Sequence, residues 1–374
     1  MKPDPIIASQ KGTLAVNLLL TAVVSVVMLI AVDLAVRMTM EPPYSRHKYG
    51  WFRPEMAMPE ATKYQDSPGK YREIKFQVGK YGFKRWGRTD TGKTRVLILG
   101  DSYTEMAYVA NGEEWYSYLE RAFPEIEFFV FGGGGYGTLQ EYMVMEDHID
   151  LIRPDLIILQ FCGNDYANNY YPLELACYPW NNRAWRPYLE KGRIRYRLPI
   201  PFGGFAGYSA IIDRLLFAHD RRVFERSRNS EFDAAKETAR RNRIDWNAMN
   251  PAAARVTERL FQMFKSRAGQ TPIYLFPAED KYNGDLEGLC RSAGFEYIKG
   301  LPEHLREKEK QGLAVKIVNN GHWNYEGNRL AGQYLTDYFE KNGILARSEG
   351  KSISVQKTSP TGTHAGEKVF ISSQ

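Results

Sequence analysis

The chain has 374 residues, of which 43% are hydrophobic and 25% are charged, and its formal net charge is +6. This length and ordinary composition indicate a globular protein with ample apolar material for a buried core. Much of the basic excess lies between Arg183 and Arg243, and because no nucleic-acid-binding module accompanies it, we interpret it as solvated or anion-facing surface and exclude nucleic acid as a partner.

A long apolar run follows a short basic N-terminal tail, residues 1–12. The run, residues 13–36, reads "TLAVNLLLTAVVSVVMLIAVDLAV" and only Asn17 and Asp33 interrupt it. It is long enough to cross the hydrocarbon core as one helix, so we predict a single-pass membrane anchor. A cleaved signal peptide is the rival interpretation, but the run is too long and ends without a small-residue cleavage site. Basic residues nearly balance on its two sides, so their count does not set the orientation.

The segment after the anchor, residues 37–70, is rich in proline and aromatic residues and lacks periodicity, which indicates a stalk near the membrane surface. The folded domain is expected at residues 71–345. Its first segment, "YREIKFQVGKYGFKRW", alternates and contains glycine turns, as a short β-ribbon does. Residues 346–374 are rich in Ser, Thr, Gly and Lys with little to bury, so we expect a disordered tail.

The domain repeats a strand–helix pattern. Continuous apolar runs that end in glycine or polar residues indicate buried parallel strands at 94–102, 126–135, 154–165 and 271–279, with a shorter one at 295–298. Apolar residues at three- and four-residue spacing indicate helices at 113–123, 138–152, 251–269 and 326–343. This alternation predicts an α/β fold with a mainly parallel sheet.

Residues 168–245 depart from that pattern, with many Tyr, Trp, Pro and Arg residues and broken periodicity. We interpret them as an insertion over one face of the sheet, partly helical around residues 208–227. The insertion is either a lid on the substrate side or a packed surface elaboration, and the residues favour neither.

The sequence gives no sign of a metal, nucleotide or flavin cofactor. Cys162, Cys177 and Cys290 are odd in number and lack the spacing of metal ligands, although a Cys177–Cys290 disulfide stays open for an oxidising compartment. The segment "TDTGKT" at 89–94 lacks the spacing of a phosphate-binding loop and precedes a strand instead of a helix.

Unusual residues follow three of the predicted strands, where ligands gather in an open parallel sheet. The first strand ends in "GDSYTE" with Ser102, which is either a nucleophile or a helix N-cap. The second ends in "FGGGGYGTLQ", whose glycines, Gly135 among them, allow close backbone approach to a ligand. The third ends in "CGNDYANN", where the Asn164 amide is able to donate to an oxyanion. Each alone has an ordinary explanation as a cap or a turn.

Together these blocks, followed near the C-terminus by "HWNYEGN" at His322, resemble the SGNH (GDSL-type) hydrolase superfamily. The resemblance covers roughly residues 94–338, with the insertion as an elaboration. It implies a three-layer α/β/α sandwich. It also implies that Ser102 is the nucleophile and that His322 is the base. The oxyanion hole would consist of the N–H groups of Ser102 and Gly135 and the amide of Asn164, with Gly134 as the alternative glycine.

The resemblance fails at one position. Family members carry an Asp three residues before the histidine, and this chain has Asn319 there. Three interpretations stay open: a Ser-His dyad or Ser-His-Asn triad that uses Asn319, a carboxylate from elsewhere such as Glu279 or Asp280, or a domain that has lost hydrolysis. Asp101 and Asp165 are embedded in the motif turns and are interpreted as structural hydrogen-bond acceptors.

The anchor and the resemblance together suggest a membrane-bound serine esterase or O-acyltransferase. Its expected substrates are small acyl esters, above all acetyl groups on an extracytoplasmic glycan, which places the catalytic domain on the periplasmic side. One alternative is a catalytically weak or inactive subunit that serves as a scaffold in a membrane protein assembly. The other is a lysophospholipase-like esterase.

Overall fold

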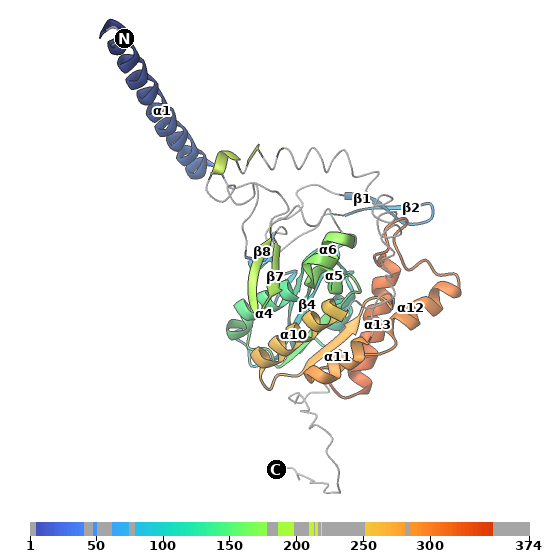
Figure 1. The fold of residues 1–374 in the computed structure, drawn as a ribbon. Helices are drawn as coiled ribbons and strands as arrows, with labels where there is room; N and C mark the ends of the chain where they lie inside the picture. Colours follow the sequence, from blue (N-terminus) through green and yellow to red (C-terminus); the bar gives the residue numbers. More distant parts are fainter. Residues whose placement is uncertain are drawn as a thin grey trace.

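The computed structural model describes residues 5–40, 48–50, 62–74, 79–177, 186–197, 209–212, 214–215, 218, 251–280 and 285–346. A three-layer α/β/α sandwich accounts for most of them (Figure 1). The fold class predicted from the sequence is therefore confirmed.

A six-stranded sheet forms the middle layer, in the order β10-β9-β6-β4-β5-β3. Its strands are β3 (Arg85–Trp86), β4 (Thr94–Gly100), β5 (Ile126–Gly132), β6 (Leu156–Phe161), β9 (Ile273–Pro277) and β10 (Glu296–Tyr297). β3 pairs antiparallel with β5 at one edge, and the other pairs are parallel. Numbered along the chain, the five parallel strands lie in the doubly wound order 2-1-3-4-5, whose switch point falls between β4 and β6.

Both faces of the sheet are buried because side chains alternate along each strand. In β4, Leu97 and Leu99 point into one core, whereas Val96 and Ile98 point into the other. All four side chains are fully buried, which explains why this strand is a continuous apolar run.

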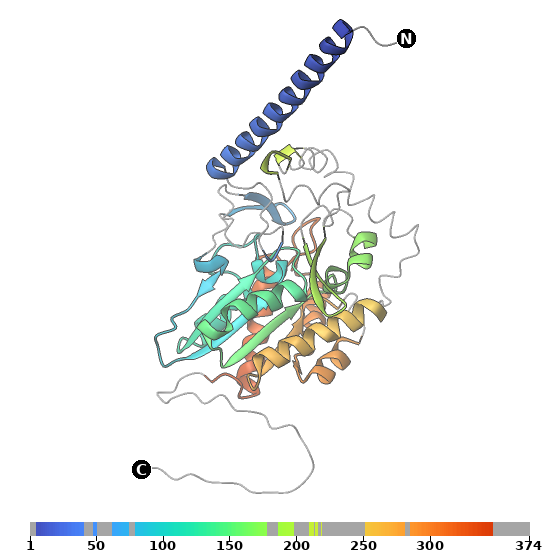
Figure 2. The ribbon, with the colours of Figure 1, turned by 60° about the vertical axis from the view of Figure 1, so that its left-hand side comes forward.

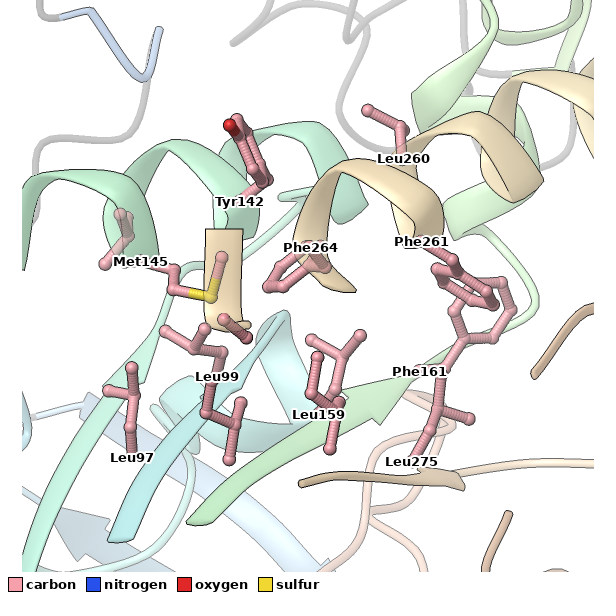
Figure 3. Packing of buried hydrophobic residues seen from close by; sticks show 14 of the residues in the cluster. Leu97, Leu99, Tyr142, Met145, Leu159, Phe161, Leu260, Phe261, Phe264 and Leu275 are labelled. Atoms are coloured by element: carbon pink, nitrogen blue, oxygen red, sulfur yellow. The ribbon is translucent and has the colours of Figure 1, made fainter. Parts of the chain in front are cut away.

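Helices cover the two faces. On the Leu97 face lie α4 (Thr138–Ile152), α10 (Pro251–Ala268) and α11 (Leu286–Ala293); on the opposite face lie α3 (Trp115–Ala122), α12 (Leu301–Lys310) and α13 (Tyr325–Lys341). Figure 3 shows the first core, in which Met145 of α4 and Phe264 of α10 pack over Leu99 and Leu159. Burial on both sides fixes the sheet, and with it the loops at its carboxyl edge.

The short β-ribbon predicted after the stalk divides into two parts. β2 (Lys70–Ile74) pairs with β1 (Thr62–Ser67) as a separate antiparallel hairpin, whereas β3 joins the central sheet. A 3₁₀ turn, Lys80–Gly82, precedes β3. β1 lies inside the segment that we assigned to the stalk, so ordered structure begins before residue 71.

The N-terminal helix α1 (Pro5–Thr39) extends away from the sandwich in both views (Figures 1 and 2). Within its stretch Thr13–Thr39, an 18-residue segment has a mean hydropathy of 2.6 and is not buried against the rest of the chain. This helix is a candidate membrane span by length and composition, and a signal sequence passes the same test.

The described part of the insertion contains α6 (Tyr171–Cys177), the hairpin of β7 (Arg186–Glu190) with β8 (Arg193–Arg197), and helical residues at 210–212, 214–215 and 218. The hydroxyl of Ser209 and the backbone N–H of Ile211 donate to Asp33 of α1, at 2.8 and 3.1 Å. The insertion therefore contacts the apolar helix. The rest of the insertion and the predicted tail from 347 onward lie outside the described residues.

The Cys177–Cys290 disulfide, which the sequence left as an alternative, is not formed. Cys290 is a free thiol, buried in the core that includes α10 and α11. Burial also raises the pKa of this thiol well above its ordinary value, so it is held as the neutral form.

Candidate active site

The carboxyl ends of β4, β5 and β6 meet at the switch point of the sheet. Ser102 begins α2 (Ser102–Glu105) directly after β4, Gly135 follows β5, and Asn164 is the N-cap of α5 (Asp165–Asn169) after β6. The three predicted blocks therefore lie on adjacent strands of the sheet, as the strand order requires.

The predicted nucleophile and base are in contact. Ser102 Oγ lies 2.7 Å from His322 Nε2, although 220 residues separate them in the chain. Both side chains are partly exposed, whereas their neighbours Asp101, Tyr103 and Trp323 are buried. This is the geometry of a serine hydroxyl whose proton a histidine is able to accept.

The other ring nitrogen of His322 faces the side chain of Asn320. Asn320 Oδ1 contacts His322 Nδ1 and also accepts the backbone N–H of His322 at 3.3 Å. The backbone N–H fixes the amide orientation, because a flipped amide would place two donors against each other. The oxygen therefore faces Nδ1, which must carry the proton, and Nε2 presents its lone pair to Ser102.

The residue at His322 Nδ1 is thus Asn320 and not Asn319, which corrects the sequence prediction by one position. Asn319 has a left-handed backbone conformation with φ 60° and is exposed. This conformation makes the turn that brings the next side chain, Asn320, back over the ring.

The loop that carries these residues, residues 317–324, is called the histidine loop below. The N–H of Ile317 donates to the carbonyl of His322 at 2.9 Å, and the N–H of Asn320 donates to the carbonyl of Ile317 at 3.1 Å. Asn324 ends the loop as the N-cap of α13, where its side chain accepts the N–H of Gly327 at 2.9 Å.

Two tyrosines that the sequence analysis did not select flank the imidazole. The Tyr103 ring lies 4.9 Å from the His322 ring and the Tyr108 ring lies 5.3 Å from it, centroid to centroid. Burial lowers the pKa of His322 from 6.5 to about 4, so the base is neutral at physiological pH. Tyr103 directly follows Ser102 in the sequence, and this position next to the predicted nucleophile is the feature that could have identified it.

The carboxylates considered as substitutes for the triad acid have other partners. Tyr103 donates its hydroxyl to Glu279, and Asp280 pairs with Arg306. Neither supplies the hydrogen bond found at His322 Nδ1, which comes from Asn320.

The structure distinguishes between the two candidate glycines of the oxyanion hole. Gly134 donates its N–H to the Glu105 carboxylate, which holds the turn against α2. Gly135 is partly exposed with φ 73°, a conformation that favours glycine. Because the N–H of Gly134 already donates to Glu105, Gly135 is the better candidate donor to an oxyanion.

Asn164 lies beside the serine turn. Its Nδ2 donates to Asn168 Oδ1 at 2.8 Å, and this contact holds the amide in place at the end of β6. Its donation to a substrate oxyanion stays a prediction.

Asp101 and Asp165 accept structural hydrogen bonds, as the sequence analysis proposed. Asp101 accepts the N–H of Tyr103 at 2.9 Å, and Asp165 accepts the N–H of Cys162 at 3.0 Å. Both carboxyl groups are fully buried, and burial raises the pKa of Asp101 to about 6. Within the described residues, no group of three or more His, Cys, Asp or Glu side chains is placed to hold a metal ion.

No protein-family model matches the chain, and no curated protein matches it. Among solved structures, it is similar to a lipolytic protein of the G-D-S-L family from Veillonella parvula, with 11% identity and a TM-score of 0.37 over 66% of this chain and 98% of that one. A catalytic mutant of an acetylxylan esterase from Geobacillus stearothermophilus gives 12% identity and a TM-score of 0.37 over 69% and 99%. A lipase/acylhydrolase from Enterococcus faecalis gives 9% identity and a TM-score of 0.35 over 67% and 96%. At these values the likeness carries no argument about function.

Proposed function

We propose that this protein is a serine-dependent ester hydrolase or O-acyltransferase. The observation that carries the proposal is the chain of contacts from Ser102 Oγ to His322 Nε2, and from His322 Nδ1 to Asn320 Oδ1. A serine, a neutral imidazole with a free lone pair, and a group that fixes its tautomer are the parts that nucleophilic acyl transfer requires.

In the proposed reaction, Ser102 Oγ attacks the ester carbonyl while His322 Nε2 takes the hydroxyl proton. The tetrahedral oxyanion is stabilised by the N–H groups of Ser102 and Gly135 and by the Asn164 amide. Removing one such donor typically costs about 10²- to 10³-fold in kcat. His322 then returns the proton to the departing alcohol, which leaves an acyl group on Ser102.

The Asn320 side chain at His322 Nδ1 is compatible with an active site, although the triad acid is missing. An Asp-to-Asn change in a serine protease triad costs about 10⁴-fold, largely because the amide holds the wrong tautomer. Here the backbone N–H of His322 fixes the orientation of the amide, so Asn320 holds the productive tautomer. Among the described residues, Asn320 and not a carboxylate contacts His322 Nδ1, so the imidazolium is less stabilised and we expect a slower reaction.

We further propose that the acyl group is small, above all acetyl, and that it comes from an extracytoplasmic glycan. Water would release it in a hydrolase, and a sugar hydroxyl would accept it in an acyltransferase. The apolar helix α1 supports membrane attachment. We propose that the catalytic domain lies on the periplasmic side. Partner proteins in the membrane are compatible with this placement.

The decisive measurement compares the full chain in detergent micelles with the Ser102→Ala variant, using p-nitrophenyl acetate. We expect turnover by the wild type only, and covalent labelling of Ser102 by a serine-directed phosphonate. Equal rates for the two proteins, with no label on Ser102, would contradict the esterase proposal and favour a scaffold subunit. Turnover of lysophospholipid in preference to acetyl esters would favour the lipid substrate instead.

A further inference from the structure

The β1–β2 hairpin lies against the histidine loop, although it belongs to a different part of the chain. Two consecutive residues of β1 make the contacts. The carbonyl of Gln65 accepts the N–H of Val318 at 3.2 Å, and the carbonyl of Asp66 accepts Asn324 Nδ2 at 3.0 Å. The hairpin is therefore bonded to the loop on both sides of His322.

Asp66 makes a second contact through its side chain. Its Oδ1 accepts the N–H of Tyr325, the first residue of α13, at 3.2 Å. A carboxylate at the N-terminus of a helix also interacts favourably with the helix dipole. The other oxygen, Oδ2, lies 3.4 Å from Arg72 Nε on the paired strand, and the Arg72 guanidinium lies over the Tyr325 ring at 4.5 Å.

The backbone of β1 explains why Asp66 is free for this role. The ladder pairs Gln65 with Tyr71 and Ser67 with Lys70, and its register shifts between them, so Asp66 is opposite no residue of β2 in the backbone ladder. Bulges of this kind redirect a side chain and leave its backbone groups unpaired. Asp66 is only 3% exposed; its carbonyl faces Asn324 of the loop, Oδ1 faces α13 and Oδ2 faces Arg72.

Asn324 connects these contacts with the loop itself. It is fully buried, and its Nδ2 also donates to the carbonyl of Ala314 at 2.8 Å. The backbone carbonyl of Asp66 thus shares this buried amide with the carbonyls of Ala314 and Lys316, which precede the loop. A loop that contains a left-handed asparagine, Asn319, requires such support, because that conformation costs of order 1 kcal/mol or more.

We propose that Asp66 is a positioning residue, and that the β1–β2 hairpin holds the histidine loop so that His322 and Asn320 meet Ser102 in the reactive geometry. This inference rests on the proposed function for its catalytic consequence. Its structural part, the restraint of the loop by Asp66, holds whether or not the site turns over esters.

The first test measures hydrogen exchange of residues 318–325 in the full chain in detergent micelles. Asp66→Ala should speed exchange at Tyr325 by about tenfold, because a hydrogen bond to a charged acceptor is lost. Asp66→Asn keeps an oxygen acceptor and should restore most of the protection. The matched control is Glu73→Ala, which removes an exposed carboxylate of the same hairpin and should leave the loop unchanged.

The second test measures kinetics with p-nitrophenyl acetate. Asp66→Ala should lower kcat by roughly tenfold or more through misplacement of the base, with KM within about twofold, and Asp66→Asn should recover most of kcat. If Asp66→Ala does not fold, Asp66→Glu takes its place. Its longer side chain displaces the carboxylate, so it should change exchange and kcat in the same direction. Unchanged exchange at residues 318–325 in a folded Asp66 variant would overturn the inference. A wild type without esterase activity would overturn the proposed function only, since the exchange measurement still decides the role of the hairpin.

Discussion

The two halves of the candidate site are held in different ways. The nucleophile turn, residues 100–105, lies inside the sandwich, where the Gln160 side chain accepts the N–H of Asp101 at 3.1 Å and the hydroxyl of Thr104 at 3.0 Å. The histidine loop lies at the surface, with Asn319 and Gly321 exposed, and hydrogen bonds hold it. Changes in the turn should therefore affect folding and catalysis together, whereas changes at the loop positions that are not buried should affect catalysis alone.

The largest effect should come from a side chain placed against the backbone of the nucleophile turn. A Cβ on Gly132, at the end of β5, would lie 2.0 Å from the backbone nitrogen of Glu105. Because the obstacle is backbone, Gly132→Ala should lower the free energy of unfolding by about 3 kcal/mol and abolish activity. Denaturant unfolding and acetate ester turnover measure the two effects. Gly92→Ala is the control, since a Cβ there meets no atom within 4 Å.

The next effect separates the two asparagines of the histidine loop. Asn320→Ala removes the oxygen that fixes the His322 tautomer and should reduce kcat by roughly 10²-fold, with little change in the melting temperature. Asn320→Asp supplies the missing charge and should raise kcat by about tenfold. Asn319→Ala and Asn319→Asp are matched changes one position earlier. A larger kinetic response at Asn319 than at Asn320 would show that the loop geometry is wrong.

The pH profile tests the surroundings of the base. His322 accepts a proton only when it is neutral, and burial lowers its pKa to about 4. The acid limb of kcat/KM, which reports the free enzyme, should therefore fall only as the pH drops through about 4. In Asn320→Asp the new carboxylate favours the imidazolium, so the limb should move to higher pH. An acid limb near 6.5 in the wild type would show that His322 is solvated.

The smallest effect is expected from the exposed side of the imidazole. Tyr108 is partly exposed, and Tyr108→Ala should admit water to the His322 ring without touching its hydrogen bonds. We expect a loss of a few-fold in kcat and a rise of the acid limb by roughly one pH unit, because desolvation is the cause of the lowered pKa. Activity assays across pH 3 to 8 would detect both; a loss as large as that of Asn320→Ala would assign Tyr108 a more direct role.

The sandwich was predictable because its signals are local. The continuous apolar run of β4 and the three blocks after β4, β5 and β6 place the strands, and the blocks taken together with His322 indicate the nucleophile. α4 was predicted with the bounds that it has, Thr138–Ile152, because its apolar periodicity is unbroken.

The histidine loop was predicted less well because its geometry depends on backbone conformation and on distant partners. Family spacing pointed to Asn319, but a left-handed turn at that residue places the Asn320 side chain at the ring. No pattern in the sequence joins Asp66 to Asn324, since the bulge that redirects Asp66 is set by pairing with β2.

The amide that completes the catalytic contacts stands immediately before a glycine, Gly321. Asn-Gly bonds are the peptide bonds most prone to deamidation, because glycine lets its nitrogen attack the side-chain carbonyl carbon and expel ammonia. Hydrolysis of the resulting ring gives either aspartate or isoaspartate at position 320. An aged sample would thus contain a fraction of chains with a carboxylate at His322 Nδ1 and a fraction with a lengthened backbone. The mass of the proteolytic peptide that contains position 320 therefore measures sample age, and it should accompany every rate measured at this site.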